Sequence, residues 1–144
     1  MILSKKSRYG LTALIDLGIS SERGQVALAG IAQRNGISQQ YLEQIFAGLR
    51  RAGIVRSVKG PQGGYLLGRN PEGIAVSQVM EALDGTYHIP AEEAGETGIG
   101  QTIQDCVIDQ VNEKLDEAVK SVTLADLIRH YREHRIDSSD MYYI

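Results

Sequence analysis

The chain has 144 residues, of which 42% are hydrophobic and 23% charged, with one cysteine and a formal net charge of −3. This length and composition predict one small domain with an appended element and an ordinary hydrophobic core. No apolar run is long enough to cross a bilayer, and the first ten residues lack the apolar stretch of a signal peptide. Because a lone cysteine cannot form an internal disulfide, we expect a cytoplasmic protein.

The charge is distributed unevenly along the chain. Residues 1–84 contain ten Lys and Arg against six Asp and Glu, a net charge of +4. Residues 85–144 contain five against twelve, a net charge of −7. Such asymmetry is expected when one end of a protein meets a polyanion and the other meets protein.

The first predicted elements are two helices. One covers residues 7–20, and its expected inner face consists of Leu11, Leu14, Ile15 and Gly18. A short helix covers residues 28–34, and Asn35-Gly36 supplies a left-handed stop after it. A short helix, a glycine-containing turn and a further helix are typical of a helix-turn-helix unit.

The third predicted helix begins after Ser38 and has two contrasting faces. Ser38 is a good N-cap, because its hydroxyl can accept a hydrogen bond from an unpaired N–H of the first turn. The inner stripe, at three- and four-residue steps, is Leu42, Ile45, Phe46 and Leu49. The outer face carries amides and charges: Gln39, Gln40, Glu43, Gln44, Arg50 and Arg51.

A hairpin follows the third helix, which ends at Ala52-Gly53. Residues 54–58 and 65–67 are its expected strands, and residues 60–64, Gly-Pro-Gln-Gly-Gly, are expected to form a flexible tip with positive φ angles. A helix-turn-helix with such a hairpin is a winged helix-turn-helix, and we assign this domain to residues 1–84, ending with a short helix over residues 76–83.

The rest of the chain is expected to contain a flexible loop over residues 85–100 and, in residues 101–144, a long helix and a C-terminal tail. The apolar residues of this helix recur mostly four apart: Ile103, Val107, Val111, Leu115, Val119 and Val122. Because nothing in the chain is left to cover this stripe, we expect a second copy to cover it. A helical piece over residues 124–131 completes a mostly α (α+β) fold with a long C-terminal dimerisation helix.

The amide-rich helix beside a basic hairpin favours binding of double-stranded DNA. The first turn of a recognition helix enters the major groove, where Gln can pair with adenine and Glu can accept from cytosine. The expected base-reading residues are Ser38, Gln39, Gln40 and Glu43. The expected backbone contacts are Tyr41, Arg50, Arg51, Arg56 and Lys59, and the tip residues that allow close approach are Gly60, Gly63 and Gly64.

The alternative interpretation is a small α+β packing unit whose glutamines are merely solvated. We favour DNA binding, because a solvated helix face is usually richer in Glu and Lys than in Gln. A protein-interaction module that does not bind DNA is a second alternative.

Three segments resemble a known family: SRYGLTALIDL near the start, ISQQYLEQIFAGLRRAGIV in the middle and VKGPQGGYLLGR in the hairpin. They are similar to the IscR/NsrR/CymR family of bacterial winged-helix transcription regulators. The resemblance implies a homodimer that binds palindromic promoter DNA, mostly as a repressor. It also implies that Lys6, Arg8 and Tyr9 contact the phosphate backbone.

The best-known branches of that family hold an iron–sulfur cluster with three cysteines between the short helix and the long one. Residues 87–105 contain no cysteine, and such clusters require thiolates. We therefore expect no iron–sulfur cluster and no other cofactor. We predict that Cys106 is a buried core cysteine; the alternative is a thiol-based redox sensor that uses Cys106.

In lacking the cluster cysteines, and in its last four residues, the chain resembles the cysteine-metabolism repressor branch of the family, CymR. Those residues are Met141, Tyr142, Tyr143 and Ile144. The resemblance implies a tail whose terminal carboxylate enters the active site of cysteine synthase (O-acetylserine thiol-lyase), where backbone N–H groups can capture it. The alternative, to which we give equal weight, is a tail that packs on the dimer.

No residue set predicts an enzyme. No Ser-His-Asp set or paired carboxylates converge, and residues 60–64 lack the following Lys-Ser or Lys-Thr of a phosphate loop. His130 and His134 have metal-ligand spacing, but without a third ligand we interpret them as exposed helix histidines and expect no metal site.

Overall fold

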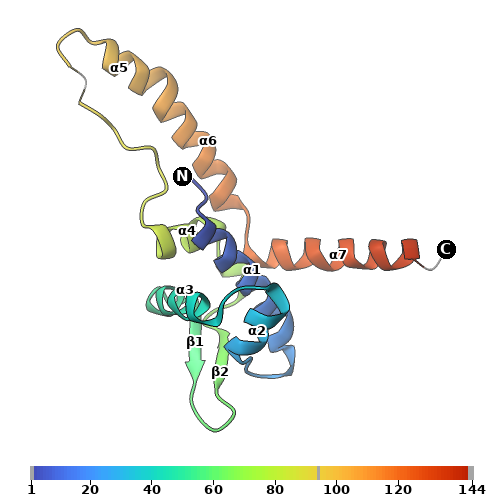
Figure 1. Cartoon of the computed structure of the whole chain (residues 1–144). Helices are drawn as coiled ribbons and strands as arrows, with labels where there is room; N and C mark the ends of the chain where they lie inside the picture. The colour runs from blue at the N-terminus through green and yellow to red at the C-terminus, as the bar shows by residue number, and fades with distance from the viewer. Residues whose placement is uncertain (1, 94, 143–144) are drawn as a thin grey trace.

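The computed structural model describes residues 2–93 and 95–142, with side chains described as far as residue 135. The elements, in chain order, are α1 Lys5–Ser20, η1 Ser21–Arg23, α2 Leu28–Asn35, α3 Gln39–Arg51, β1 Val55–Val58, β2 Gly64–Leu67, η2 Pro71–Gly73, α4 Val76–Asp84, α5 Ile99–Ile103, the π-helical turn η3 Gln104–Ile108, α6 Asp109–Ser121 and α7 Leu124–Tyr142. Helices α1 to α4 and the hairpin pack together, while α5 to α6 form a rod that projects from them and α7 leaves in another direction (Figure 1). This mostly helical winged fold confirms the predicted fold class.

Helix α1 lies at the centre of the core. It begins two residues earlier than predicted, because Ser4 caps it by accepting a hydrogen bond from the Ser7 N–H. Its fully buried apolar residues are Ala13, Leu14 and Leu17. The predicted inner face was therefore only partly correct: Leu14 is buried, but Leu11 and Ile15 lie at the edge of the core and are half-buried.

Two glycines allow other helices to approach α1 closely. A Cβ on Gly10 would lie 2.5 Å from a methyl group of Leu83 in α4, and a Cβ on Gly18 would lie 2.5 Å from Ile128 in α7. Ile128 and Leu124 are buried in the same core as α1. The core consequently extends beyond residue 84 and includes the first turns of α7.

The short elements around the third helix agree with the sequence analysis. Helix α2 ends at a left-handed Gly36, with φ 63°. Ser38 caps α3 by accepting a hydrogen bond from the Tyr41 N–H, 3.1 Å away. The stripe predicted to face inward, Leu42, Ile45, Phe46 and Leu49, is completely buried.

The long helix differs from its prediction at both ends. It starts at Ile99, contains the π-helical turn η3, and ends at Ser121, so Val122 does not belong to it. Val122 is extended, and its carbonyl accepts a hydrogen bond from the Val76 N–H at 2.9 Å. Thr123 and Asp126 then exchange side-chain and backbone hydrogen bonds, a capping box that starts α7.

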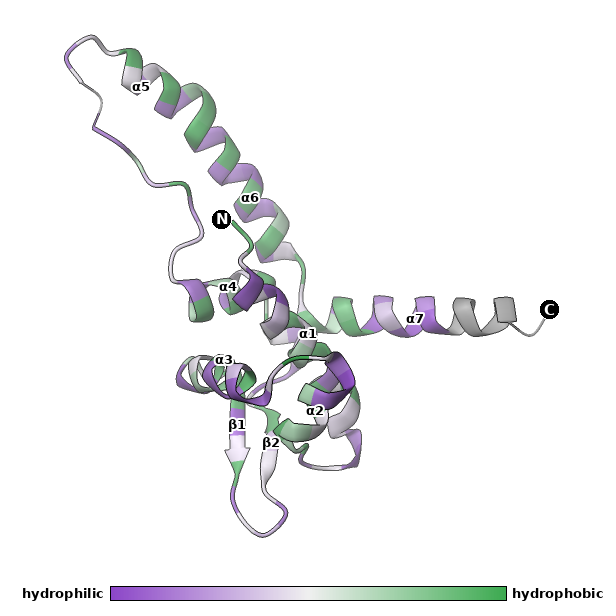
Figure 2. Cartoon of the chain, in the orientation of Figure 1, coloured by the Kyte–Doolittle hydropathy of each residue, from purple (hydrophilic) through white to green (hydrophobic). Residues whose placement is uncertain are grey.

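Apolar and polar residues alternate along the rod of α5 and α6 and give it two faces (Figure 2). The apolar side chains near its free end are exposed: Ile99, Ile103, Val107 and Val111. Leu115 and Val119, nearer the core, are half-buried. Cys106 is exposed, so the prediction of a buried core cysteine was wrong for the single chain. The sequence period marks an apolar helix face, but no segment among the described residues covers Cys106.

The loop that follows α4 is anchored at its start. The Tyr87 hydroxyl donates to Asp116 Oδ1 at 2.5 Å, and Asn112 exchanges hydrogen bonds with the backbone of Ile89. Burial, together with the Asp116 carboxylate, raises the pKa of Tyr87 to about 12. These contacts join the base of the loop to α6.

The C-terminal helix is longer than predicted. A helix over residues 124–131 followed by a tail was expected, but α7 continues to Tyr142. Of the four predicted partner-binding residues, Met141 and Tyr142 end α7 with side chains that are not described, and Tyr143 and Ile144 lie outside the described residues.

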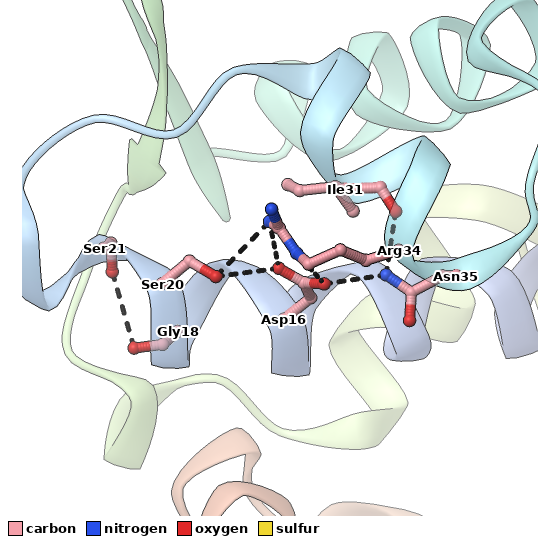
Figure 3. Close-up of polar contacts among 7 residues, drawn as sticks. All are labelled: Asp16, Gly18, Ser20, Ser21, Ile31, Arg34 and Asn35. Carbon is pink, nitrogen blue, oxygen red and sulfur yellow. Dashed lines mark hydrogen bonds and ion pairs between the residues drawn. The ribbon is translucent and has the colours of Figure 1, made fainter.

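A polar cluster joins α1 to α2 around the Asp16 carboxylate (Figure 3). Arg34 donates to both Asp16 oxygens, at 2.7 and 3.0 Å, and Asn35 donates to Oδ2 at 2.8 Å. Although partial burial of Asp16 opposes ionisation, the hydrogen bonds from Arg34, Asn35 and Ser20 outweigh it and lower the pKa of this carboxyl below 3.8.

The Arg34→Gln variant should lower the free energy of unfolding at pH 7 by about 0.5–1 kcal/mol. The expected loss is small because Arg34 is half exposed and solvent screens its interaction with Asp16. A lowered folded-state pKa stabilises the fold above the unfolded value of 3.8, and this stabilisation is lost as the pH falls through the folded-state pKa. Urea unfolding at several pH values should therefore show a stability difference between the unaltered and Arg34→Gln proteins that fades below pH 3.8.

Lys114→Gln, which breaks an exposed pair with Glu117, is the control and should change the free energy of unfolding little. A stability difference for Arg34→Gln that does not depend on pH would contradict the role assigned to Asp16.

Candidate nucleic-acid interface

The first turn of α3 presents polar side chains to solvent. Ser38, Gln39, Gln40 and Glu43 are all exposed, whereas Leu42 between them is completely buried. Because the buried stripe holds α3 in the core, the opposite face is fixed in an outward orientation. The residues predicted to read bases therefore lie together on one accessible surface.

The hairpin is a two-stranded antiparallel sheet that is attached to the segment before α2. Strand β1 pairs with β2 in the register Val55 to Leu67 and Val58 to Gly64. On the other side of β2, Val26 and Tyr65 exchange two backbone hydrogen bonds, at 2.8 and 3.0 Å. The Gln25 side chain also donates to the Gln62 carbonyl at 2.9 Å. This isolated bridge holds the wing beside the helix-turn-helix.

Glycines are needed in the wing for two different reasons. Gly60 has a positive φ of 131°, as predicted, but the positive-φ expectation was wrong for Gly63 and Gly64. A Cβ on Gly63 would lie 2.7 Å from the Val58 carbonyl oxygen, and one on Gly64 would lie 2.5 Å from that of Val26. Close approach of backbone segments requires glycine at these two positions.

A groove of about 450 Å³ separates the first turn of α3 from the wing. It is lined by Gln39 and Glu43 from α3 and by Gly63 and Gly64 from the wing. Phe46 supports it from below, because its ring meets the Tyr65 ring edge to face at 4.9 Å between centroids. The fold thus brings together two sets of predicted residues that are twenty or more positions apart in the sequence.

The start of α1 adds a second group of predicted contacts. The rings of Tyr9 and Tyr41 meet edge to face, with centroids 5.8 Å apart. Lys5 Nζ lies 5.4 Å from the centre of the Tyr9 ring. Lys6 is half-buried and Arg8 exposed. Sequence reasoning missed Lys5, although its four-residue spacing to Tyr9 is the signal for this cation–π contact.

The remaining predicted cations are exposed but are not all near the groove. Arg56 lies on β1, and Lys59 lies between the strands of the wing. Arg50 and Arg51 occupy the last turn of α3. They follow Gln39 and Gln40 by ten to twelve residues, and at about 1.5 Å per helical residue this separates the two pairs by roughly 15–18 Å. The structure therefore separates this arginine pair from the base-reading turn.

The residues present do not fit an iron–sulfur cluster held by thiolates. Such a cluster requires several cysteine ligands, and this chain has only Cys106. In the described part of the chain, no three His, Cys, Asp or Glu residues are arranged to hold a metal ion. The exposed rings of His130 and His134 stack on each other, with centroids 4.1 Å apart.

Comparisons with known proteins agree with this geometry. The model of the Rrf2 family, described as an iron-dependent transcriptional regulator, matches residues 3–130. The HTH-type transcriptional regulator IscR of Klebsiella pneumoniae (strain 342) is 39% identical over 132 residues, which cover 90% of this chain and 81% of the relative. The structure of CymR, the global cysteine regulator of B. subtilis, is 35% identical with a TM-score of 0.77, covering 88% of this chain and 95% of that chain. The structure of IscR from T. potens is 36% identical with a TM-score of 0.74, covering 91% of this chain and 88% of that chain.

The winged helix-turn-helix and these relatives define the chain as a DNA-binding transcription regulator. It belongs to the Rrf2 family, which confirms the resemblance to the IscR/NsrR/CymR regulators. The relatives are regulators rather than enzymes, in agreement with the prediction that this chain is not an enzyme. Within the described residues, no helix combines the length and the apolar character that a membrane span requires.

The Gly64→Ala variant should weaken the attachment of the wing. Its new Cβ would collide with the backbone carbonyl of Val26, so we expect the free energy of unfolding to fall by about 1–3 kcal/mol. The Tyr65 amide, which donates to that carbonyl, should exchange its hydrogen faster. Gly73→Ala is the matched control, since a Cβ there meets nothing within 4 Å. Unfolding and hydrogen exchange should be measured on both variants, and equal effects would refute the proposed role of the Val26 contact.

Proposed function

We propose that this protein is a homodimeric repressor that binds pseudo-palindromic promoter DNA. The observation that carries the proposal is the exposed first turn of α3 beside the wing groove. One recognition helix from each copy would enter the major groove, so the half-sites should be separated by whole helical turns. The positive charge of residues 1–84 supports contact of this part with DNA.

The two kinds of residue at the interface have different roles in this proposal. Ser38, Gln39, Gln40 and Glu43 read base edges, because they occupy the turn that can reach the floor of the groove. The backbone contacts come from Lys6, Arg8, Tyr9, Tyr41, Arg56 and Lys59, with Gly60, Gly63 and Gly64 admitting the sugar-phosphate chain. Arg50 and Arg51, at the far end of α3, contact phosphates outside the central turn.

The rod of α5 and α6 supplies the dimer interface in this proposal. Ile99, Ile103 and Val107 are 65%, 49% and 53% exposed, which is unusual for large apolar residues that share a helix face. Val111 continues the face, and Leu115 and Val119 extend it toward the core. Pairing of two rods would cover this face and place the two α3 helices in one assembly. Cys106, exposed beside Val107, keeps thiol-based redox sensing as the second candidate function.

Regulation of cysteine metabolism is the finer part of the proposal. The structural similarity to the global cysteine regulator CymR and the lack of cluster-holding thiolates support it. The C-terminal residues 141–144, which end in Tyr-Ile, would bind cysteine synthase, and O-acetylserine in that enzyme would compete with them. Substrate supply would then control repression through the partner enzyme.

Gln40→Ala and Lys59→Ala should affect DNA binding in different ways. Loss of the Gln40 amide should relax the preference for one base and cost about 1–3 kcal/mol on the specific site only. Loss of Lys59 should weaken binding to all duplexes and reduce the slope of log affinity against log salt by about one. Gel shifts on specific and random duplex at several salt concentrations measure both; if the two variants lose affinity equally on both duplexes, the assignment of roles is wrong.

Deletion of Tyr143 and Ile144 should abolish co-purification with cysteine synthase, because it removes the terminal carboxylate and the aliphatic side chain that would fill the pocket. The dimer and its affinity for DNA alone should remain. Size-exclusion chromatography of the mixed proteins, with and without O-acetylserine, checks this. Unchanged binding of the synthase to the shortened chain would end the idea.

A further inference from the structure

A cavity of about 310 Å³ lies between α1, α2 and α7. None of its lining residues is among the predicted DNA contacts. Its volume falls at the lower end of the range for small-molecule sites in proteins. It joins the helix-turn-helix to the C-terminal helix, so an occupant would contact both parts.

The acidic group of this cavity is already occupied by hydrogen-bond donors. Asp16 Oδ1 accepts from Arg34 and from Ser20, at 2.7 and 2.9 Å, and Oδ2 accepts from Arg34 and Asn35. The carboxylate therefore holds the Arg34 guanidinium in place rather than offering an acceptor to a ligand (Figure 3). Gly30 helps to seat the same group, since a Cβ there would lie 3.0 Å from Arg34 Nη1.

A second guanidinium enters the cavity from α7. Arg129 and Arg132 on this helix pair with Asp126 and Glu22, respectively. Arg135 contacts the Tyr131 hydroxyl at 3.4 Å, and it meets no carboxylate in the part of the chain whose side chains are described. The charged residues that line the cavity are thus two arginines and one aspartate, a net positive charge.

The walls between these groups are largely apolar. Ile15 and Ile19 of α1 line the cavity and are only half-buried, and the Tyr131 ring is 44% exposed. A planar guanidinium matches a carboxylate through paired N–H donors. The Nε and Nη2 donors of Arg34 are already paired with Asp16, so Arg135 is the guanidinium that can present a paired edge to a ligand, and the apolar side chains favour a hydrocarbon body.

We propose that this cavity, which Arg34 and Arg135 both line, binds a small organic carboxylate with its head group on the Arg135 guanidinium and its apolar body against Ile15 and Ile19. Such a ligand would connect α2, which carries the turn to the recognition helix, with α7. If it binds the DNA-bound and free forms with different affinity, it changes the affinity for DNA by the same factor. The site requires neither the thiol nor the C-terminal residues of the proposed function.

Calorimetric titration of the full chain with hexanoate tests the site, with hexan-1-ol and hexylamine as probes of equal chain length. Hexanoate should bind and the alcohol and amine should not, and the side-chain methyl signals of Ile15 and Ile19 should shift in NMR spectra. Arg135→Gln should weaken hexanoate binding about tenfold, and Arg135→Lys, which keeps the charge but loses the planar group, should weaken it less. Arg129→Gln on the same helix is the matched control and should bind as the unaltered chain does.

Equal affinity of the Arg135→Gln and Arg129→Gln proteins would overturn the proposal, as would equal binding of hexanoate and hexylamine or the absence of any hexanoate binding. Inorganic phosphate that binds as well as hexanoate would exclude the role of the apolar wall. Because no DNA is present in these titrations, their failure would leave the proposed DNA-binding function untouched.

Discussion

The pair of backbone hydrogen bonds between Val26 and Tyr65 determines how the two parts of the candidate interface are arranged. A two-stranded hairpin on its own is marginally stable and can take many orientations. Here β2 has a further backbone partner in the segment that leads into α2, and Gly64 lets the two chains approach. The orientation of the wing relative to α3 therefore follows from one short piece of backbone, supported by the contact between Phe46 and Tyr65.

A second constraint joins the DNA-binding part to the C-terminal part. Gly10 and Gly18 on α1 allow α4 and α7 to pack against the same helix, and Val122 bonds to the start of α4. The rod of α5 and α6 is thus attached at its base through α4, α7 and the anchored loop around Tyr87. Helix α1 thus packs against both α4 and α7 and also carries the Tyr9 contact to α3.

Much of the fold was predictable, because helix caps and apolar periodicity are local properties. Ser38 and the stripe from Leu42 to Leu49 gave α3 and its exposed face correctly. The attachment of the wing could not be predicted in this way, since the Val26 to Tyr65 contact joins residues that no periodic pattern relates. The requirement for glycine at positions 63 and 64 was missed for the same cause. A neighbouring backbone segment excludes a Cβ at Gly63 and Gly64, and their own φ angles do not require glycine.

The error at Cys106 also concerns contacts that the local sequence does not specify. Periodicity marks an apolar face but does not say what covers it, so Cys106 was placed in a core, whereas it is exposed in the part of the chain that the structure describes. The Thr123 to Asp126 capping box was a readable signal for the break before α7 and was overlooked. Lys5 was likewise readable from its spacing to Tyr9. The cavity between α1, α2 and α7 was not, because its two arginines come from segments a hundred residues apart.

The central claim is that two copies of the chain bind double-stranded DNA together, each through the exposed turn of α3 and the attached wing. Selection of bound duplexes from a random pool tests this claim most directly. The account predicts enrichment of a pseudo-palindrome whose half-sites lie whole helical turns apart, with weaker enrichment by the Gln40→Ala protein at one position of each half-site. Enrichment of single, unpaired sites, or no enrichment over the starting pool, would contradict it.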